Sequence, residues 1–124
     1  GNIMEFYTTA NSGNINITAG VTTYNSVSDY RLKASIIPLN GATQRFMSLN
    51  PIRFNFVNDA KNTFDGFIAH ELASVVPEAV NGIKDAIDKE GKPVYQSVDN
   101  AKLIPLIVAT LQEIIKRIGL LEEK

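Results

Sequence analysis

The sequence has no cysteine, no tryptophan and a single histidine, His70. The absence of cysteine excludes disulfide bonds and thiolate metal ligands, and one imidazole leaves few routes to histidine-based catalysis. No apolar run approaches the roughly 18 residues that cross a membrane. The 12 basic and 13 acidic residues give a net charge of -1, so the chain lacks the strongly basic surface typical of nucleic-acid-binding proteins. We therefore expect neither a membrane nor a nucleic acid as a partner.

The N-terminal end of the chain also has little charge. Glu5 is the only charged residue in positions 1–27, a segment rich in Asn, Thr and Ser. β-favouring patches at 15–18 and 21–24 stand beside glycines, a pattern typical of short strands joined by turns. So short a segment cannot bury a core alone. The change in composition predicts a boundary near position 28, between a β-rich segment at 1–27 and a second piece at 28–124.

The second piece mixes helix and strand signals, which predicts an α+β fold with a small sheet region and short helices. Phe54 and Phe56 alternate with polar residues, as in a half-buried strand with both rings in the core. Gly91 marks the turn of a hairpin, and prolines follow two of the helical segments. The expected elements are, in order, a helix at 29–36 capped by Ser28 or Asp29, a strand at 53–57, a helix at 68–75, a hairpin with arms 83–87 and 93–98, and a helix at 100–123.

The last of these elements is a long amphipathic helix. Asp99 is suited to cap its start, and Pro105 falls early enough to leave the helix intact. One set of apolar residues repeats at steps of three and four, the spacing of a coiled-coil seam. This seam consists of Ile104, Ile107, Leu111, Ile114, Ile118 and Leu121. Leu111 and Ile114 at successive seam positions favour three or four helices over two. The alternative is a single helix buried in its own domain.

Hydroxyl chemistry is the catalytic route that the composition leaves open. Ser28 and Lys33 stand five residues apart at the composition boundary. A serine needs a base to become a nucleophile, and a lysine serves as that base when burial lowers its pKa toward neutrality. On one helix the two side chains would point apart, whereas a Ser28 that precedes the helix lets the chain fold back. The alternative is a capping serine and a solvated lysine.

No cofactor and no metal site is expected. The eight glycines form neither a GxxxxGK nor a GxGxxG phosphate loop. His70 and Glu71 are adjacent, so on a helix they point in different directions and lack the spacing of a zinc site.

Three blocks of sequence together resemble one family. They are SDYRLK at 28–33, GFIAHEL at 66–72 with PEAV at 77–80, and SVD at 97–99 before a long helix that ends in LLEE. In this order they resemble the C-terminal intramolecular chaperone domain of bacteriophage tail spikes, tail fibres and neck appendages. That self-cleaving domain was first associated with endosialidases and is classed as a serine peptidase. The resemblance implies a homotrimer that guides three copies of an upstream β-rich fibre into a triple-stranded fold and then releases itself.

The resemblance also implies roles for particular residues. Ser28 matches the nucleophile and the first residue of the released domain, which makes Val27–Ser28 the scissile bond. Lys33 matches the general base of a Ser-Lys dyad that cleaves once. Asp29 and Arg31 match recurrent positions that fix the local geometry.

Two further residues of the second block have roles implied by the resemblance. His70 stands where family members have glutamine or histidine. Its functional interpretation is a polar group near the cleavage site that orients the reacting carbonyl. The alternative is a partly buried helix residue hydrogen-bonded to backbone. Glu71 is expected to pair with a basic residue such as Arg31.

The partners implied by the resemblance are further copies of the chain and the upstream fibre region of the same polypeptide. The precursor would be made in the host cytoplasm, and the released domain would be absent from the mature virion. One alternative is a trimerisation module of a fibre protein without enzymatic activity. Another is the related domain of certain membrane-bound transcription factors, which the fibre-like upstream segment disfavours.

Overall fold

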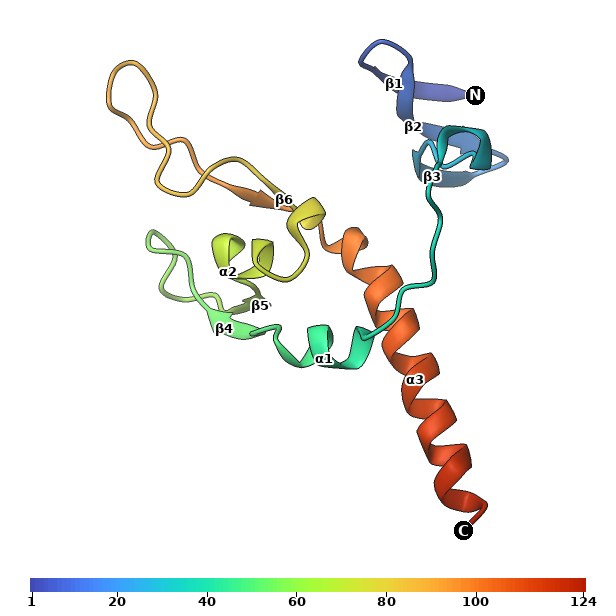
Figure 1. Ribbon diagram of the computed structural model, residues 1–124. Helices are drawn as coiled ribbons and strands as arrows, with labels where there is room; N and C mark the ends of the chain where they lie inside the picture. Colours follow the sequence, from blue (N-terminus) through green and yellow to red (C-terminus); the bar gives the residue numbers. More distant parts are fainter. The chain divides into compact units, whose positions relative to one another are not determined.

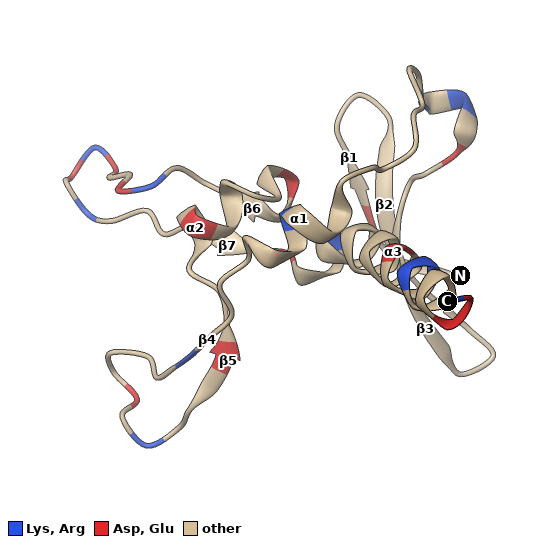
Figure 2. Cartoon of the chain, turned by 60° about the horizontal axis from the view of Figure 1, so that its bottom comes forward, with Lys and Arg blue, Asp and Glu red and all other residues tan.

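The computed structural model describes residues 1–124 and divides them into two compact units (Figure 1). The N-terminal unit is Gly1–Pro38 and the C-terminal unit is Leu39–Lys124. A β-rich N-terminal region, small two-stranded sheets, short helices and a long C-terminal helix together confirm the α+β class. In Figure 2 the three strands of the N-terminal unit are almost wholly uncharged, whereas the long loops of the C-terminal unit carry several charged residues. No helix of the chain combines the length and the apolar character needed to cross a membrane.

The N-terminal unit contains one antiparallel sheet with the strand order β1-β2-β3. Its strands are β1 (Asn2–Tyr7), β2 (Asn11–Thr18) and β3 (Val21–Ser26). β2 and β3 are joined by Ala19 and Gly20, with φ angles of 50° and 80°. Positive φ at both central residues is the geometry of the tightest hairpin turns. The sequence prediction of strands on either side of Gly20 is therefore confirmed.

The helix predicted at 29–36 is wrong in length. Only one 3-10 turn forms there, η1 (Tyr30–Leu32), with Asp29 as its N-cap. Lys33 has an extended backbone with φ of −112°, and Ser35 has a φ of 53°. Neither conformation continues a right-handed helix, so the turn ends before the apolar residues that suggested a longer element.

The C-terminal unit is built around a small core shared by its helices. The helical elements are α1 (Ala42–Met47), α2 (Ala69–Ala73), η2 (Pro77–Ala79), η3 (Asn100–Leu103) and α3 (Ile104–Glu122). The buried apolar residues are Ala42, Leu72, Val76, Ala79, Leu103 and Leu106. α2 confirms the helix predicted at 68–75, with slightly narrower bounds, and the chain leaves it before Pro77.

Two short antiparallel pairs complete the C-terminal unit. β4 (Ile52–Phe54) pairs with β5 (Phe64–Gly66), and β6 (Val80–Asn81) pairs with β7 (Ser97–Val98). The loops that follow β4 and β6 project away from the helices (Figure 1).

The strand predicted at 53–57 is confirmed only in its first half, and its two rings are not part of the core. Phe54 and Phe56 meet edge to face at 5.0 Å between ring centres, and Phe64 joins them across the hairpin. Phe56 remains 55% exposed. Aromatic rings on a projecting hairpin pack on one another, so this cluster is separate from the buried residues.

The predicted hairpin of residues 83–98 has its turn but few regular strand residues. Asp88 donates its backbone N–H to the carbonyl of Lys92 at 2.8 Å, and Val94 donates to Ala86 at 2.8 Å. Gly91, in the turn, has a φ of 79°. Regular pairing is restricted to the base of the arm, between β6 and β7.

The long C-terminal helix is confirmed, with a tighter first turn than predicted. Asp99 Oδ1 accepts a hydrogen bond from the backbone N–H of Ala101 at 3.1 Å, so Asp99 caps η3. Pro105 follows in the first turn of α3, where its missing N–H costs no hydrogen bond.

The side of α3 that faces its own unit is not the predicted seam. Leu103, Leu106 and Thr110 are buried, at the end of η3 and along α3. The six seam residues, in contrast, are 38% to 67% exposed in a single chain. The helix therefore has one side packed on its own unit and a second apolar side in contact with water.

Glu113 of α3 supplies the N-terminal cap of α1. The N-cap residue of α1, Gly41, has no side chain to offer. The Glu113 carboxylate accepts the backbone N–H of Ala42 at 3.0 Å and that of Thr43 at 2.8 Å, and it also accepts the Thr43 hydroxyl. These hydrogen bonds, with the Thr43 hydroxyl first, hold the pKa of the Glu113 carboxyl below its usual value of 4.5. A carboxylate at a helix N-terminus is also favoured by the helix dipole.

We expect Glu113→Gln to lower the thermal midpoint of unfolding at neutral pH. A group whose pKa is lowered on folding stabilises the fold above its unfolded pKa, and this contribution is lost as pH falls through the folded pKa. The difference between parent and variant should therefore shrink below about pH 4.5. Thermal unfolding followed by circular dichroism between pH 3 and pH 7 measures it. Glu122→Gln, at the exposed end of the same helix, is the control and should show no such pH-dependent difference.

Candidate functional site

The candidate site lies where the N-terminal sheet stops. Val27 follows β3, and its backbone N–H donates to the carbonyl of Ser12 at 3.1 Å. Pairing with β2 thus extends one residue past β3. The Val27–Ser28 peptide bond is the first bond after this pairing, and Val27 is 42% exposed. The bond expected to be cut is therefore at the surface, with its N-terminal side fixed to the sheet.

Ser28 and Lys33 are brought into contact directly after the sheet. Lys33 Nζ donates a hydrogen bond to Ser28 Oγ at 2.5 Å. The η1 turn makes this contact possible, since Lys33 also donates its backbone N–H to the carbonyl of Tyr30 at 3.1 Å. The chain folds back as expected for a Ser28 that precedes the helical turn. Both side chains are exposed.

Asp29 and Arg31 hold the same turn from within. Arg31 donates its backbone N–H and its Nε to Asp29 Oδ1, both at 2.9 Å, and its Nη2 to Oδ2 at 3.0 Å. The side-chain hydrogen bonds from Arg31, followed by its backbone N–H, lower the pKa of the Asp29 carboxyl. A forked arginine–carboxylate pair of this kind fixes geometry as well as charge. Asp29 and Arg31 therefore fix the backbone between Ser28 and Lys33.

Arg31 and Glu71, which were expected to pair, each have a partner within their own unit. The Arg31 guanidinium is bound to Asp29. Glu71 Oε1 instead accepts a hydrogen bond from Asn50 Nδ2 at 2.9 Å. Asp29 is close to Arg31 in sequence, so the turn of η1 is enough to bring them together.

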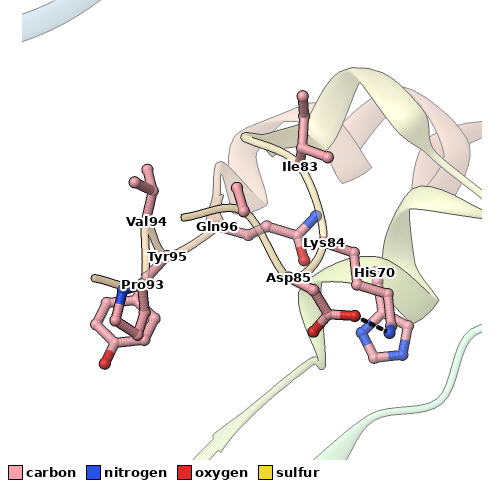
Figure 3. A pocket seen from close by; sticks show the side chains of 9 residues that line it. His70, Ile83, Lys84, Asp85, Pro93, Val94, Tyr95 and Gln96 are labelled. Atoms are coloured by element: carbon pink, nitrogen blue, oxygen red, sulfur yellow. Dashed lines mark hydrogen bonds and ion pairs between the residues drawn. The ribbon is translucent and has the colours of Figure 1, made fainter. Parts of the chain in front are cut away.

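His70 lies in the C-terminal unit, on α2, and borders a hollow of about 360 Å³. Figure 3 shows its ring beside the side chains of Lys84 and Asp85. Lys84 Nζ and Asp85 Oδ2 form an ion pair at 2.6 Å. The hydrogen bond from Lys84, followed by the charge of Lys84, lowers the pKa of the Asp85 carboxyl. The other lining residues are Ile83, Ala86, Pro93, Val94, Tyr95 and Gln96.

Sequence reasoning missed the hollow because its walls come from the hairpin arm, which has no motif. The left-handed backbone of Asp85, with a φ of 61°, gives no sequence signal either. No group of three or more His, Asp and Glu side chains in the chain could hold a metal ion.

The comparison with known families bears on the segment that carries Ser28 and Lys33. Residues 28–81 match the family model Peptidase_S74, described as the chaperone of endosialidase. The matched range starts at Ser28 and includes the blocks SDYRLK, GFIAHEL and PEAV. No curated protein matches the chain. Residues 28–81 are therefore similar to the chaperone of endosialidase family.

Proposed function

We propose that residues 28–124 form an intramolecular chaperone that trimerises, guides the folding of the β-rich region upstream, and then cuts itself free at Val27–Ser28. The family supports the chaperone role and the peptidase class. The single observation that carries the cleavage proposal is the 2.5 Å contact between Lys33 Nζ and Ser28 Oγ. That contact lies at the first matched residue of the family and directly after the last paired residue of the sheet.

The proposed reaction is one intramolecular acyl transfer followed by hydrolysis. Neutral Lys33 accepts the proton of Ser28 Oγ, and Oγ attacks the carbonyl carbon of Val27. The C–N bond of the tetrahedral intermediate breaks, Lys33 returns its proton to the departing nitrogen of Ser28, and an ester to Oγ remains. Water then hydrolyses the ester, leaving a carboxylate at Val27 and a free hydroxyl and amine at Ser28. Attack by a serine on its own preceding carbonyl needs a constrained turn, which the Asp29–Arg31 pair supports.

Cleavage in this scheme depends on assembly. A lysine serves as a base near neutral pH only in a site that excludes water. Lys33 and Ser28 are both exposed in a single chain, so the proposed cover comes from neighbouring copies. An unassembled chain would then keep its client attached, and release would follow trimer formation.

The exposed seam of α3 supports the proposed trimer. Its six residues form an apolar stripe that the chain's own C-terminal unit does not cover. The whole chain exposes 10251 Å², whereas two free-standing compact units of the same total mass would expose about 7,800 Å². The excess is about 2,500 Å² per chain, as much as one partner contributes to a large interface between subunits that exist only as complexes. A trimer that forms through the seam would bury part of this excess surface.

A separable chaperone also fits the physics of fibre folding. A β-rich fibre made of three chains has mostly interchain contacts, so its first register carries a large entropy cost. A trimer of C-terminal domains raises the local concentration of the upstream ends. Once the domain is removed, the fibre lacks its folding template and is held by a high unfolding barrier. The released domain is then absent from the mature virion.

We expect Ser28→Ala and Lys33→Ala each to reduce cleavage of the full chain at least about 1,000-fold, because each removes one half of the reacting pair. Lys33→Arg should have the same effect, since a guanidinium is never neutral at physiological pH. Intact mass spectrometry measures the reaction through one fragment that ends at Val27 and one that begins at Ser28.

The matched control for the dyad is Ser26→Ala, which removes a hydroxyl on β3 outside the reacting pair. It should cleave like the parent. A parent chain that keeps its full mass after assembly would leave the non-enzymatic trimerisation module as the function.

We expect Asp29→Asn to slow cleavage about 10- to 100-fold, because it breaks the fork that holds the turn and displaces the attacking oxygen. The control is Asp65→Asn, which breaks another surface ion pair, Arg53 Nε to Asp65 Oδ1 at 3.0 Å, in the C-terminal unit and outside the turn that holds Ser28 and Lys33. Time courses by mass spectrometry should show a slower reaction for the first variant alone. Equal rates would mean that the fork has no part in the reaction.

We expect Leu111→Lys or Ile114→Lys to dissociate the trimer, because three copies of either lysine would meet in the seam. Light scattering at micromolar concentration on a Ser28→Ala background, which keeps the chain whole, should give three times the chain mass of 13.6 kDa for the parent. The control, Gln112→Lys, places the same charge on an exposed position of α3 outside the seam and should remain trimeric. A monomeric parent would contradict the trimer.

A further inference from the structure

The sheet of the N-terminal unit has two unlike faces. Residues paired directly across antiparallel strands point to the same face. Met4 pairs with Ile15, and Ile15 pairs with Tyr24, so these three form one row. The neighbouring rows on that face contain Phe6 and Ser26 on either side of Gly13, and Ile17 opposite Thr22. We call the side formed by Met4, Phe6, Ile15, Ile17, Thr22 and Tyr24 the apolar face.

The opposite side, the polar face, is covered by amides that satisfy one another. Asn16 Nδ2 donates to Asn2 Oδ1 at 2.7 Å, and Asn25 Nδ2 donates to Asn14 Oδ1 at 2.8 Å. The remaining members of the polar face are Glu5, Thr18, Thr23 and, at its edge opposite Thr18, Val21. Glu5 accepts hydrogen bonds from Tyr7 and Asn2, which lower the pKa of its carboxyl. A hydrated face with its hydrogen bonds already made does not need a partner.

The apolar face, by contrast, is uncovered. Met4, Phe6, Ile17 and Tyr24 are between 41% and 79% exposed. Side chains of these sizes leave an apolar patch of about 500 Å², near the upper end of what monomeric proteins expose. The face also carries no charged residue. A charged partner would thus find no complementary group on it.

We propose that the apolar face packs against the same face of other copies of this chain, with the polar face turned to solvent. The inference rests on the proposed trimer, which brings three copies of the sheet together. An uncharged apolar surface is complementary to itself. Three copies of a 500 Å² patch would bury up to about 1,500 Å² in total, or about 500 Å² per pair of copies, which is less than a free-standing interface needs and therefore adds to the contact through the seam. The apolar face is therefore the part of the client that assembly removes from water.

Two adjacent threonines provide a matched test. Thr22 is on the apolar face opposite Ile17, and Thr23 is on the polar face opposite Asn16. Both are exposed in a single chain. The chain has no cysteine, so Thr22→Cys and Thr23→Cys each introduce one thiol of nearly the same size as the side chain replaced.

Both variants are prepared in the full chain on a Ser28→Ala background, and their reaction with a thiol-specific reagent is timed under native conditions. We expect the thiol of Thr22→Cys to react at least about tenfold more slowly than that of Thr23→Cys, because burial excludes the reagent. Adding Leu111→Lys, which dissociates the seam, should remove the difference.

The possible outcomes separate this inference from the proposed function. Protection of the Thr22→Cys thiol alone supports the apolar interface. Equal reactivity of the two thiols in a chain that light scattering shows to be trimeric overturns the interface and leaves the trimer standing. Protection of the Thr23→Cys thiol alone would place the interface on the polar face and overturn this inference. A monomeric chain overturns both the interface and the proposed trimer.

Discussion

The packing of α3 along one of its sides is the contact on which the C-terminal unit depends. Leu103 and Leu106 join the buried core from the start of this helix. Thr110 is also buried, and its hydroxyl donates to the carbonyl of Leu106 at 2.7 Å, so its burial leaves no unpaired polar group. Glu113 continues the same side and ties α1 to the helix. Because a helix can bury only part of its circumference in one contact, the seam is left on the outside.

Local patterns predicted the elements whose determinants lie close together in the sequence. The Gly20 turn, the helix before Pro77 and the Asp99 cap all rest on neighbouring residues, and all are found in the structure. α1 could not be predicted in this way. Its cap is supplied by Glu113, 71 residues after Ala42, and no local pattern reveals a partner at that distance.

The candidate site shows the same division between local and distant determinants. The contact of Ser28 with Lys33 follows from a turn closed within six residues, so reasoning about the fold-back of the chain could find it. The prediction of a helix after Asp29 was wrong because helix propensity does not reveal that Lys33 has an extended backbone. The residues around His70 belong to the hairpin arm of residues 83–98, more than ten residues further along the chain. No sequence motif there indicated that they would lie beside His70. Phe56 was placed in the core by its alternation with polar residues, yet alternation alone does not distinguish a core from a cluster of rings on a projecting hairpin.

The hydrogen bond from the Val27 N–H to the Ser12 carbonyl has a consequence for the fibre that a cut at Val27–Ser28 would leave behind. The new carboxyl terminus would belong to a residue already bound to the neighbouring strand. A chain end that is hydrogen-bonded within a sheet is a poor protease substrate, since proteolysis begins at exposed, flexible termini. The end of the finished fibre would thus resist proteolysis because the cut falls directly after the last paired residue of the sheet.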